Sequence, residues 1–333
     1  MTSLSNRPNP GAAPPPIGDA SPATPATGPH PGRDQRVVGL ACALGAFLIW
    51  GFAPIYFKAV SSAGPLEVLS HRVVWTVLLL GCVLAVLGRF NGIAAELRRP
   101  GRLKVYLACT VLISANWLTF IWAVFNDHLL QASLGYYINP LVTIALGVVF
   151  LSERLNRWQV LAVGLAAAGV GVLVIGYGEV PWVSLVLAVS FAVYSLIRKS
   201  ARVDPMIGLQ VETMLLVVPA IGYLVFLGVA GGSSFIGGGW VMSLLLVAGG
   251  LVTAAPLILF MYGAQRLTLT TIGVMQYLAP SLHFVLAVLV YEEPLGTGQV
   301  ITFVAIWLGL ACYTGDAMVR HRAAGRAATD PTR

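Results

Sequence analysis

The sequence YYINPLVTIALGVVFLSERL at residues 136–155 returns in a related form, QYLAPSLHFVLAVLVYEEPL, at residues 276–295. Each copy has a polar and aromatic entry, a proline, an apolar run of helix length and a charged exit. Six aligned positions are identical: Tyr137/Tyr277, Pro140/Pro280, Leu146/Leu286, Val148/Val288, Glu153/Glu293 and Leu155/Leu295. The same offset of 140 residues aligns Pro65 with Pro205 and Phe120 with Phe260. The chain is therefore predicted to consist of two related halves.

The composition is that of an integral membrane protein. Of the 333 residues, 57% are hydrophobic and 10% are charged, whereas a soluble domain carries about 25% charged residues. The four cysteines lie singly in apolar runs, which predicts neither a disulfide framework nor a metal site. The sequence lacks the phosphate-binding, dinucleotide-binding and hydrolase motifs, so we predict no enzymatic activity and no cofactor.

Ten apolar runs follow a tail at residues 1–34 that is rich in proline and alanine and is predicted to be disordered and cytoplasmic. Each run is close to the roughly 20 residues that cross the hydrocarbon layer. The predicted spans are 36–57, 67–88, 103–125, 130–150, 157–176, 180–197, 208–229, 240–262, 271–291 and 298–318. The predicted fold class is thus an all-α integral membrane protein with ten transmembrane helices.

The distribution of Lys and Arg predicts the orientation of these spans. Eighteen of the 20 basic residues fall in the termini and the even-numbered loops, and Lys58 and Arg72 are the exceptions. This bias predicts a cell-membrane protein with both termini in the cytoplasm, and it accounts for the net charge of +7 without nucleic acid. Since each half has five spans, residues 35–178 and 179–318 are expected to form two inverted repeats, followed by a basic cytoplasmic tail at 319–333.

Two charged residues fall within predicted spans, at equivalent positions of the two halves: Arg72 and Glu212. A charge at the membrane centre costs roughly 2.5–3.5 kcal/mol on insertion scales unless it is paired or hydrated. One hypothesis is that Arg72 and Glu212 approach each other, or face one polar cavity. The alternative is that Arg72 lies at a hydrated outer end of its helix together with Glu67 and His71.

Further polar residues gather beside the prolines of the repeat and in the third span. Tyr136, Tyr137 and Asn139 precede Pro140, and Gln276 and Tyr277 precede Pro280. Paired helix breaks of this kind are typical of transport sites, although a plain kink is the alternative. Asn116 is expected to bind either a substrate or a neighbouring helix. His71, Glu212 and His283 are candidates for carrying a coupled proton, while packing is the simpler role for a single histidine.

Several segments resemble one known family: WGFAPIYFK (50–58), EVLSHRVVW (67–75), SANWLTFIWAV (114–124), SLGYYINPL (133–141), TAAPLILF (253–260) and QYLAPSLHFVLAV (276–288). They are similar to RarD-type permeases, also labelled chloramphenicol-sensitive proteins, of the EamA group in the drug/metabolite transporter superfamily. The resemblance covers about residues 35–318. It implies ten helices in two EamA repeats and an inner-membrane location.

The predicted function is a secondary transporter that moves a small organic solute, such as a metabolite or drug-like compound, by alternating access. The predicted substrate-binding residues are Arg72, Asn116, Tyr136, Tyr137, Asn139, Glu212, Gln276 and Tyr277. Arg72 would recognise an anion, because a guanidinium binds a carboxylate through two hydrogen bonds. The alternative is a non-transporting membrane scaffold or sensor that regulates a partner. Small residues at four-residue spacing allow close helix contact, but they do not by themselves predict a homodimer.

Overall fold

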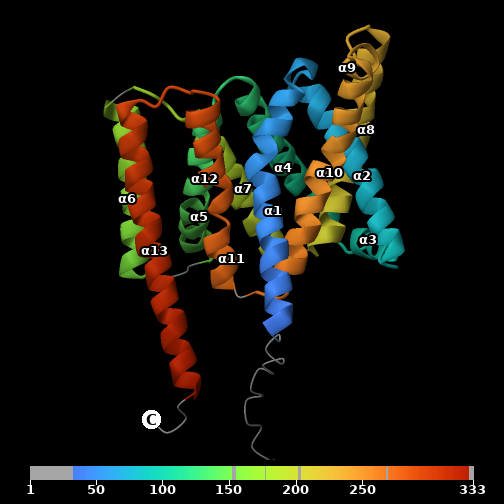
Figure 1. The fold of residues 1–333 in the computed structure, drawn as a ribbon. Coiled ribbons are helices and arrows are strands. Elements are labelled where there is room, and N and C mark those ends of the chain that lie inside the picture. Colours follow the sequence, from blue (N-terminus) through green and yellow to red (C-terminus); the bar gives the residue numbers. More distant parts are fainter. Residues whose placement is uncertain (1–32, 152–154, 177, 202–203, 268, 330–333) are drawn as a thin grey trace, which may run out of the picture.

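The computed structural model describes residues 33–151, 155–176, 178–201, 204–267 and 269–329, and within these ranges every regular element is helical (Figure 1). The predicted disordered tail therefore lies almost wholly outside the described residues. We call the face that carries residues 59–65, 126–128 and 291–296 the upper face, after its place in Figure 1. The lower face carries residues 87–101 and 265–267.

Ten apolar helices occupy the ten predicted positions. Eight are long and apolar enough to cross a membrane: α1 (Arg33–Ala59), α2 (Pro65–Val86), α4 (Arg102–Phe125), α5 (Leu129–Leu151), α6 (Arg157–Gly171) continued by η2 (Val172–Gly176), α8 (Pro205–Val229), α10 (Gly239–Ala264) and α13 (Thr297–Thr329). Two have shorter apolar stretches: α7 (Trp182–Ala201), and α12 (Leu278–Val285) continued by η3 (Leu286–Val290). The predicted class, an all-α membrane protein, is confirmed.

Short helices complete the described chain: η1 (Ser61–Ala63), α3 (Asn91–Leu97), α9 (Ser234–Gly237) and α11 (Leu269–Met275). The hydropathy pattern predicted none of them as a separate element, because each is shorter than a span. The structure also continues α13 to Thr329, so it assigns helix to residues 319–329, which were predicted to be a tail.

Helix starts follow local chemistry in both halves. Pro65 and Pro205 occupy the first helical position of α2 and α8, where a missing N–H costs no hydrogen bond. The Asp204 carboxylate accepts hydrogen bonds from the N–H groups of Met206 and Ile207, each at 3.0 Å, and so caps α8. The repeat is thus visible at the level of single helix ends.

The predicted paired breaks occur in one half only. α5 runs through Pro140 as one helix, which leaves the Tyr136 carbonyl without its usual helical donor. In the second half, a turn at Gln276 and Tyr277 separates α11 from α12. Pro280 then lies in the first turn of α12, where no intrahelical donor is required. The prediction of a break at Asn139–Pro140 was therefore wrong.

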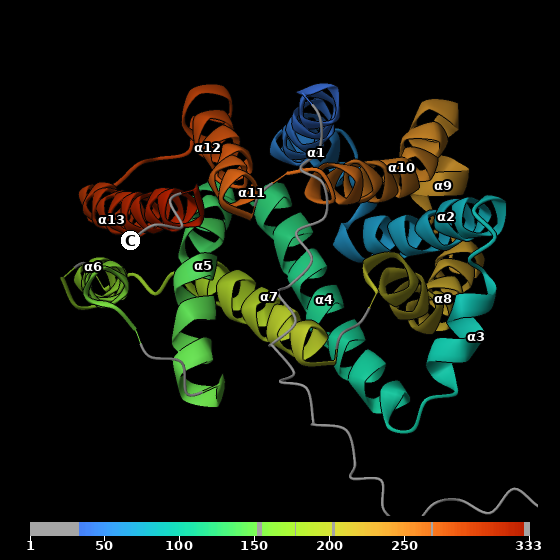
Figure 2. The same cartoon turned by 90° about the horizontal axis from the view of Figure 1, so that it is seen from below.

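Equivalent helices pack alike in the two halves. α1 packs on α10, as its counterpart α7 packs on α4, and α7 lies between α5 and α4 when the molecule is seen from below (Figure 2). α6 and α13 pack together at one edge of the bundle (Figure 2). Tyr137 and Tyr277 stack with ring centroids 6.3 Å apart, so two identical positions of the repeat meet inside the molecule.

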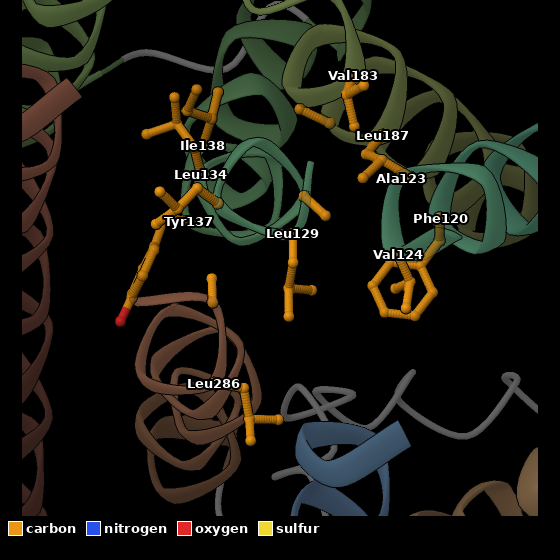
Figure 3. Close-up of a cluster of buried hydrophobic side chains, with 14 of the residues drawn as sticks. Phe120, Ala123, Val124, Leu129, Leu134, Tyr137, Ile138, Val183, Leu187 and Leu286 are labelled. Atoms are coloured by element: carbon orange, nitrogen blue, oxygen red, sulfur yellow. The ribbon is translucent and has the colours of Figure 1, made fainter. Parts of the chain in front are cut away.

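The main core joins α5 to α4, α7 and α12 (Figure 3). Phe120 and Val124 of α4, Leu187 of α7 and Leu286 of η3 lie around the buried side chains of α5 (Figure 3). Close packing at this crossing requires Gly135, since a Cβ there would lie 2.8 Å from the Ser184 carbonyl oxygen. This core fixes α5 at the centre of the bundle.

Candidate functional site

The candidate site is centred on Arg72, which α2 carries into the centre of the bundle. Its Nε donates a hydrogen bond of 2.5 Å to Thr253 Oγ1 on α10. The guanidinium carbon lies 4.2 Å from the ring centroid of Trp117 on α4 and 5.7 Å from that of Phe57 on α1. Aromatic faces attract a cation through the negative potential of the ring. Three helices besides α2 therefore hold this guanidinium in place.

Arg72 has no acidic partner among the described residues. The ion pairs of the described chain join Lys58 to Asp127, Arg89 to Asp204, Arg99 and Arg102 to Glu96, and Arg198 to Glu212. Arg72 is nevertheless only partly buried. The rings and the hydroxyl group therefore hold the Arg72 cation without a carboxylate among the described residues.

Two tyrosines and a histidine stand beside the arginine. Tyr56 and Tyr136 are both close enough to interact electrostatically with Arg72. Tyr136 packs against His283, with ring centroids 5.8 Å apart, and against Phe120. His283 Nε2 lies 3.0 Å from the Trp50 carbonyl oxygen, while its buried Nδ1 has no hydrogen-bond partner in the described part of the chain. The predicted residues Arg72, Tyr136 and His283 thus lie in one region.

Glu212 belongs to a different cluster. It is fully buried, and its Oε2 accepts a hydrogen bond of 3.0 Å from the Tyr194 hydroxyl and lies 3.5 Å from Arg198 Nη1. Arg198 also donates to the carbonyl oxygens of Asp204 and Pro205. The hypothesis that Glu212 pairs directly with Arg72 was therefore wrong. Sequence alone did not indicate Arg198, which lies at the end of its span.

The remaining predicted residues are distributed over the interior. Asn116 donates to the Leu187 carbonyl oxygen at 3.0 Å and to Ser190 Oγ at 2.9 Å, so it joins α4 to α7, which is the helix-packing alternative. Tyr137 and Ser281 share a hydrogen bond of 2.6 Å beside the stacked Tyr277. These contacts place Asn116 and Tyr137 in the scaffold around the site.

For three other predicted residues, the described contacts do not involve Arg72. Asn139 accepts a hydrogen bond from Thr143 within α5. Gln276 is exposed at the turn between α11 and α12. His71 stacks on Phe235, with ring centroids 4.8 Å apart, near the capping contacts of Glu67 with α9.

On the upper face, Glu293 holds the start of α5. Its two carboxylate oxygens accept hydrogen bonds from the N–H groups of Leu129 at 2.7 Å and Leu130 at 2.8 Å. The first N–H groups of a helix have no partner within that helix, and the helix dipole favours a negative charge there. Sequence reasoning missed this contact, because it joins positions 164 residues apart.

Further contacts surround this carboxylate. Glu292 has a positive φ of 53°, and the following Glu293 N–H donates to the Ala287 carbonyl oxygen, which turns the chain back toward α5. Lys58 forms an ion pair of 2.5 Å with Asp127 and lies over the Tyr291 ring. Burial raises the pKa of Glu293, and the Asp127 carboxylate adds to this rise, against the opposing effect of the Leu130 and Leu129 amides and of His128.

The corresponding region of the lower face is open. A groove of about 590 Å³ is lined by Val105 of α4, Phe150 of α5 and the last three turns of α7. Arg198, at the position that corresponds to Lys58, makes its described polar contacts only with α7, α8 and the residue before α8. The described contacts thus join helix ends on the upper face, whereas on the lower face Phe150 and the end of α7 line a groove.

Comparison with known proteins agrees with this fold. The profile of the EamA-like transporter family matches residues 37–175. The chain is 42% identical over 297 residues to an uncharacterized transporter of Vibrio cholerae, covering 89% of this chain and 98% of that protein. It is 41% identical over 288 residues to protein RarD of Escherichia coli, covering 86% and 97% of the two chains. A solved crystal structure with 22% identity aligns over 84% of this chain and 96% of its own, with a TM-score of 0.51.

The apolar helices and these relatives together define the class of protein as a membrane transporter. Within that class, the chain belongs to the EamA-like transporter family, as a RarD-type permease.

Proposed function

We propose that this protein is a secondary transporter of the cell membrane that binds a small organic solute at Arg72 and exposes it alternately to the two faces. The observation that carries the proposal is a mid-span arginine, held by Thr253, Trp117 and Phe57, without an acidic partner in the described chain. A charged group in this environment is costly, so its presence within a span points to a function.

The difference between the two faces supports alternating access. The upper face is held together by Glu293 on α5 and by Lys58 on Asp127, whereas Phe150 of α5 and the end of α7 line a groove on the lower face. In a protein built from two inverted halves, each half can in turn adopt the packing of the other. On this view the described arrangement is one end state, closed above, with both termini on the cytoplasmic lower side.

The residues near Arg72 have separate roles in this proposal. Arg72 provides the charge, and Tyr56, Trp117 and Tyr136 provide the aromatic walls. Glu212, His71 and His283 are the candidates for a coupled proton, since all three are buried and each has one polar atom without a hydrogen bond to the described residues. Asn116, Tyr137 and Tyr277 keep the surrounding helices in register.

The proposal is tested by metabolite exchange in whole cells. Wild type, Arg72→Ala and Arg266→Ala would be expressed at matched membrane levels, and metabolites inside and outside the cells would be profiled by untargeted mass spectrometry. Arg266 is the matched control, because its guanidinium also lies over an aromatic ring, 4.3 Å from Tyr262, but is exposed at the lower face.

We expect one solute class to be redistributed by wild type and by Arg266→Ala, but not by Arg72→Ala. If no solute moves in several growth media, the transporter proposal fails, and a scaffold or sensor role follows. If Arg72→Ala moves the solute as well as wild type does, Arg72 is not part of the solute-binding site.

A further inference from the structure

Arg72 differs from several other arginines of the described chain, which do contact carboxylates. Arg198, like Arg72, is largely buried, and it lies 3.5 Å from the Glu212 carboxylate. Arg102 and Arg89 likewise have Glu96 and Asp204. Arg72 has the most interior position of these arginines and has no carboxylate within 4.0 Å in the described chain. The electrostatic balance of the bundle centre therefore lacks one negative charge.

The geometry around Arg72 leaves the terminal nitrogens available. Only Nε forms a hydrogen bond to a described residue, Thr253. The guanidinium carbon lies over the Trp117 ring, and no hydrogen bond from the terminal nitrogens to the described residues accompanies this contact. The terminal edge of a guanidinium matches a carboxylate through two parallel hydrogen bonds. A planar anion is therefore the ligand chemistry that this arrangement can complete.

The surroundings also limit the total charge of the ligand. Lys58 of α1 and Arg198 of α7, two described cations at helix ends, already contact Asp127 and Glu212. A second negative charge on the ligand would have no cation to neutralise it away from bulk water. The nearby walls are Phe57, Trp117 and Phe120 with Tyr136, which favour an apolar or aromatic body.

We propose that the transported solute is a small monocarboxylate with an aromatic or other apolar body, whose carboxylate binds the terminal nitrogens of Arg72. This inference rests on the proposed transport function and adds the substrate class to it. It also explains the asymmetry of the repeat: the position equivalent to Arg72 holds Glu212, which is neutralised within the protein by Arg198.

The test is ligand binding to the purified full-length protein in detergent. Three probes share one body and differ in charge: 3-phenylpropionate, its primary amide, and benzylmalonate, which carries two carboxylates. Binding is measured as the rise in melting temperature and as the change in tryptophan fluorescence, since Trp117 lies against Arg72. Wild type, Arg72→Gln, Arg72→Lys and the control Arg266→Ala are compared.

We expect 3-phenylpropionate to stabilise wild type and Arg266→Ala, and to bind at least tenfold more tightly than either its amide or benzylmalonate. Arg72→Gln should lose this preference, and Arg72→Lys should retain only part of it, since an ammonium cannot form the two parallel hydrogen bonds. If a variant does not fold, the binding of the three probes to wild type alone still tests whether the site prefers a single carboxylate.

Two results would overturn the inference. Equal binding of the amide and the carboxylate to wild type would exclude charge recognition, and absence of binding by the carboxylate would exclude the substrate class. The exchange experiment above separates this failure from failure of transport: a neutral or cationic solute that moves only when Arg72 is present would leave transport intact. A carboxylate that binds but never crosses the membrane would leave the site intact and remove transport.

Discussion

The upper end of η3 and the lower end of α5 occupy corresponding places in the two halves, and different contacts are described for each. Val290 aligns with Phe150, and both follow an apolar helical run. Beyond Val290, Tyr291 lies beneath Lys58 and Glu293 holds the first two N–H groups of α5. Phe150 instead lines a groove beside the end of α7. Glu153, the counterpart of Glu293 in the sequence, lies outside the described residues.

This comparison teaches that a repeat in sequence does not impose a repeat in packing. Two similar segments can hold two different arrangements in one molecule when each arrangement lies within a few kcal/mol of the other. An internal difference of this kind is what alternation between two end states requires. The predictions below test which contacts maintain the difference.

The largest effect is expected on the lower side, from Arg198→Ala. The change leaves the Glu212 carboxylate fully buried without its cation, and breaking such a pair costs about 3 kcal/mol or more. Thermal unfolding in detergent should therefore show a much lower melting temperature. In the double variant Arg198→Ala/Glu212→Gln, the neutral amide should recover part of the loss. Equal melting temperatures for Arg198→Ala and wild type would show that this pair does not stabilise the lower side.

A smaller loss is expected on the upper side, from Glu293→Ala. Two buried helix-start N–H groups lose their acceptor, which should destabilise the closed face by about 2 kcal/mol. Glu293→Gln, which keeps one acceptor oxygen, should lose less. Lys58→Ala is the matched control, because its ion pair with the exposed Asp127 should contribute less than about 1 kcal/mol. A greater loss for Lys58→Ala than for Glu293→Ala would assign closure of the upper face to the ion pair.

The smallest effects are expected from pH, with opposite signs on the two faces. Burial raises the pKa of Glu293, so the closed upper face gains stability as the pH falls through that raised value. For Asp204, burial opposes the shift, but the Ile207 N–H and Arg89 prevail and lower the pKa. Its contribution is therefore present above the ordinary value of about 3.9 and is lost as the pH falls below it.

Melting temperatures between pH 3 and pH 8 check both signs. The advantage of wild type over Glu293→Gln should grow toward low pH, whereas its advantage over Asp204→Asn should vanish there. A parallel pH dependence for the two variants would contradict the assignment of opposite shifts.

Much of the fold was predictable, because span length and hydropathy are properties of contiguous sequence. The ten apolar runs became ten helices with ends within a few residues of those predicted, with two exceptions: the ninth run is divided by the turn between α11 and α12, and α13 continues to Thr329. At Pro140 the helix continues for a tertiary reason. A proline disrupts a helix interior by removing one hydrogen bond, and packing of α5 against α4, α7 and α12 outweighs that loss.

The candidate site was predictable only in part. Arg72 was identifiable because a charge stands out in an apolar run, and Tyr136 because it precedes the proline of the repeat. The partner of Glu212 was not identifiable, since Arg198 falls at the end of its span, where a basic residue is ordinary. The role of Glu293 was not identifiable either, because in the sequence it is an acidic residue of a loop, and only the fold brings the start of α5 next to it.

The amino-acid sequence by itself determined that this chain crosses a membrane, that its two halves are related and that one arginine lies within a span. These properties depend on composition, spacing and self-similarity, which folding does not alter. Only the tertiary structure decided that Arg72 has no described carboxylate, that Glu212 pairs with Arg198, and that Glu293 caps the start of α5. Those outcomes depend on whether two groups come within the roughly 3 Å that a hydrogen bond or an ion pair requires. Glu293 and the start of α5 meet this condition although they lie far apart in the chain.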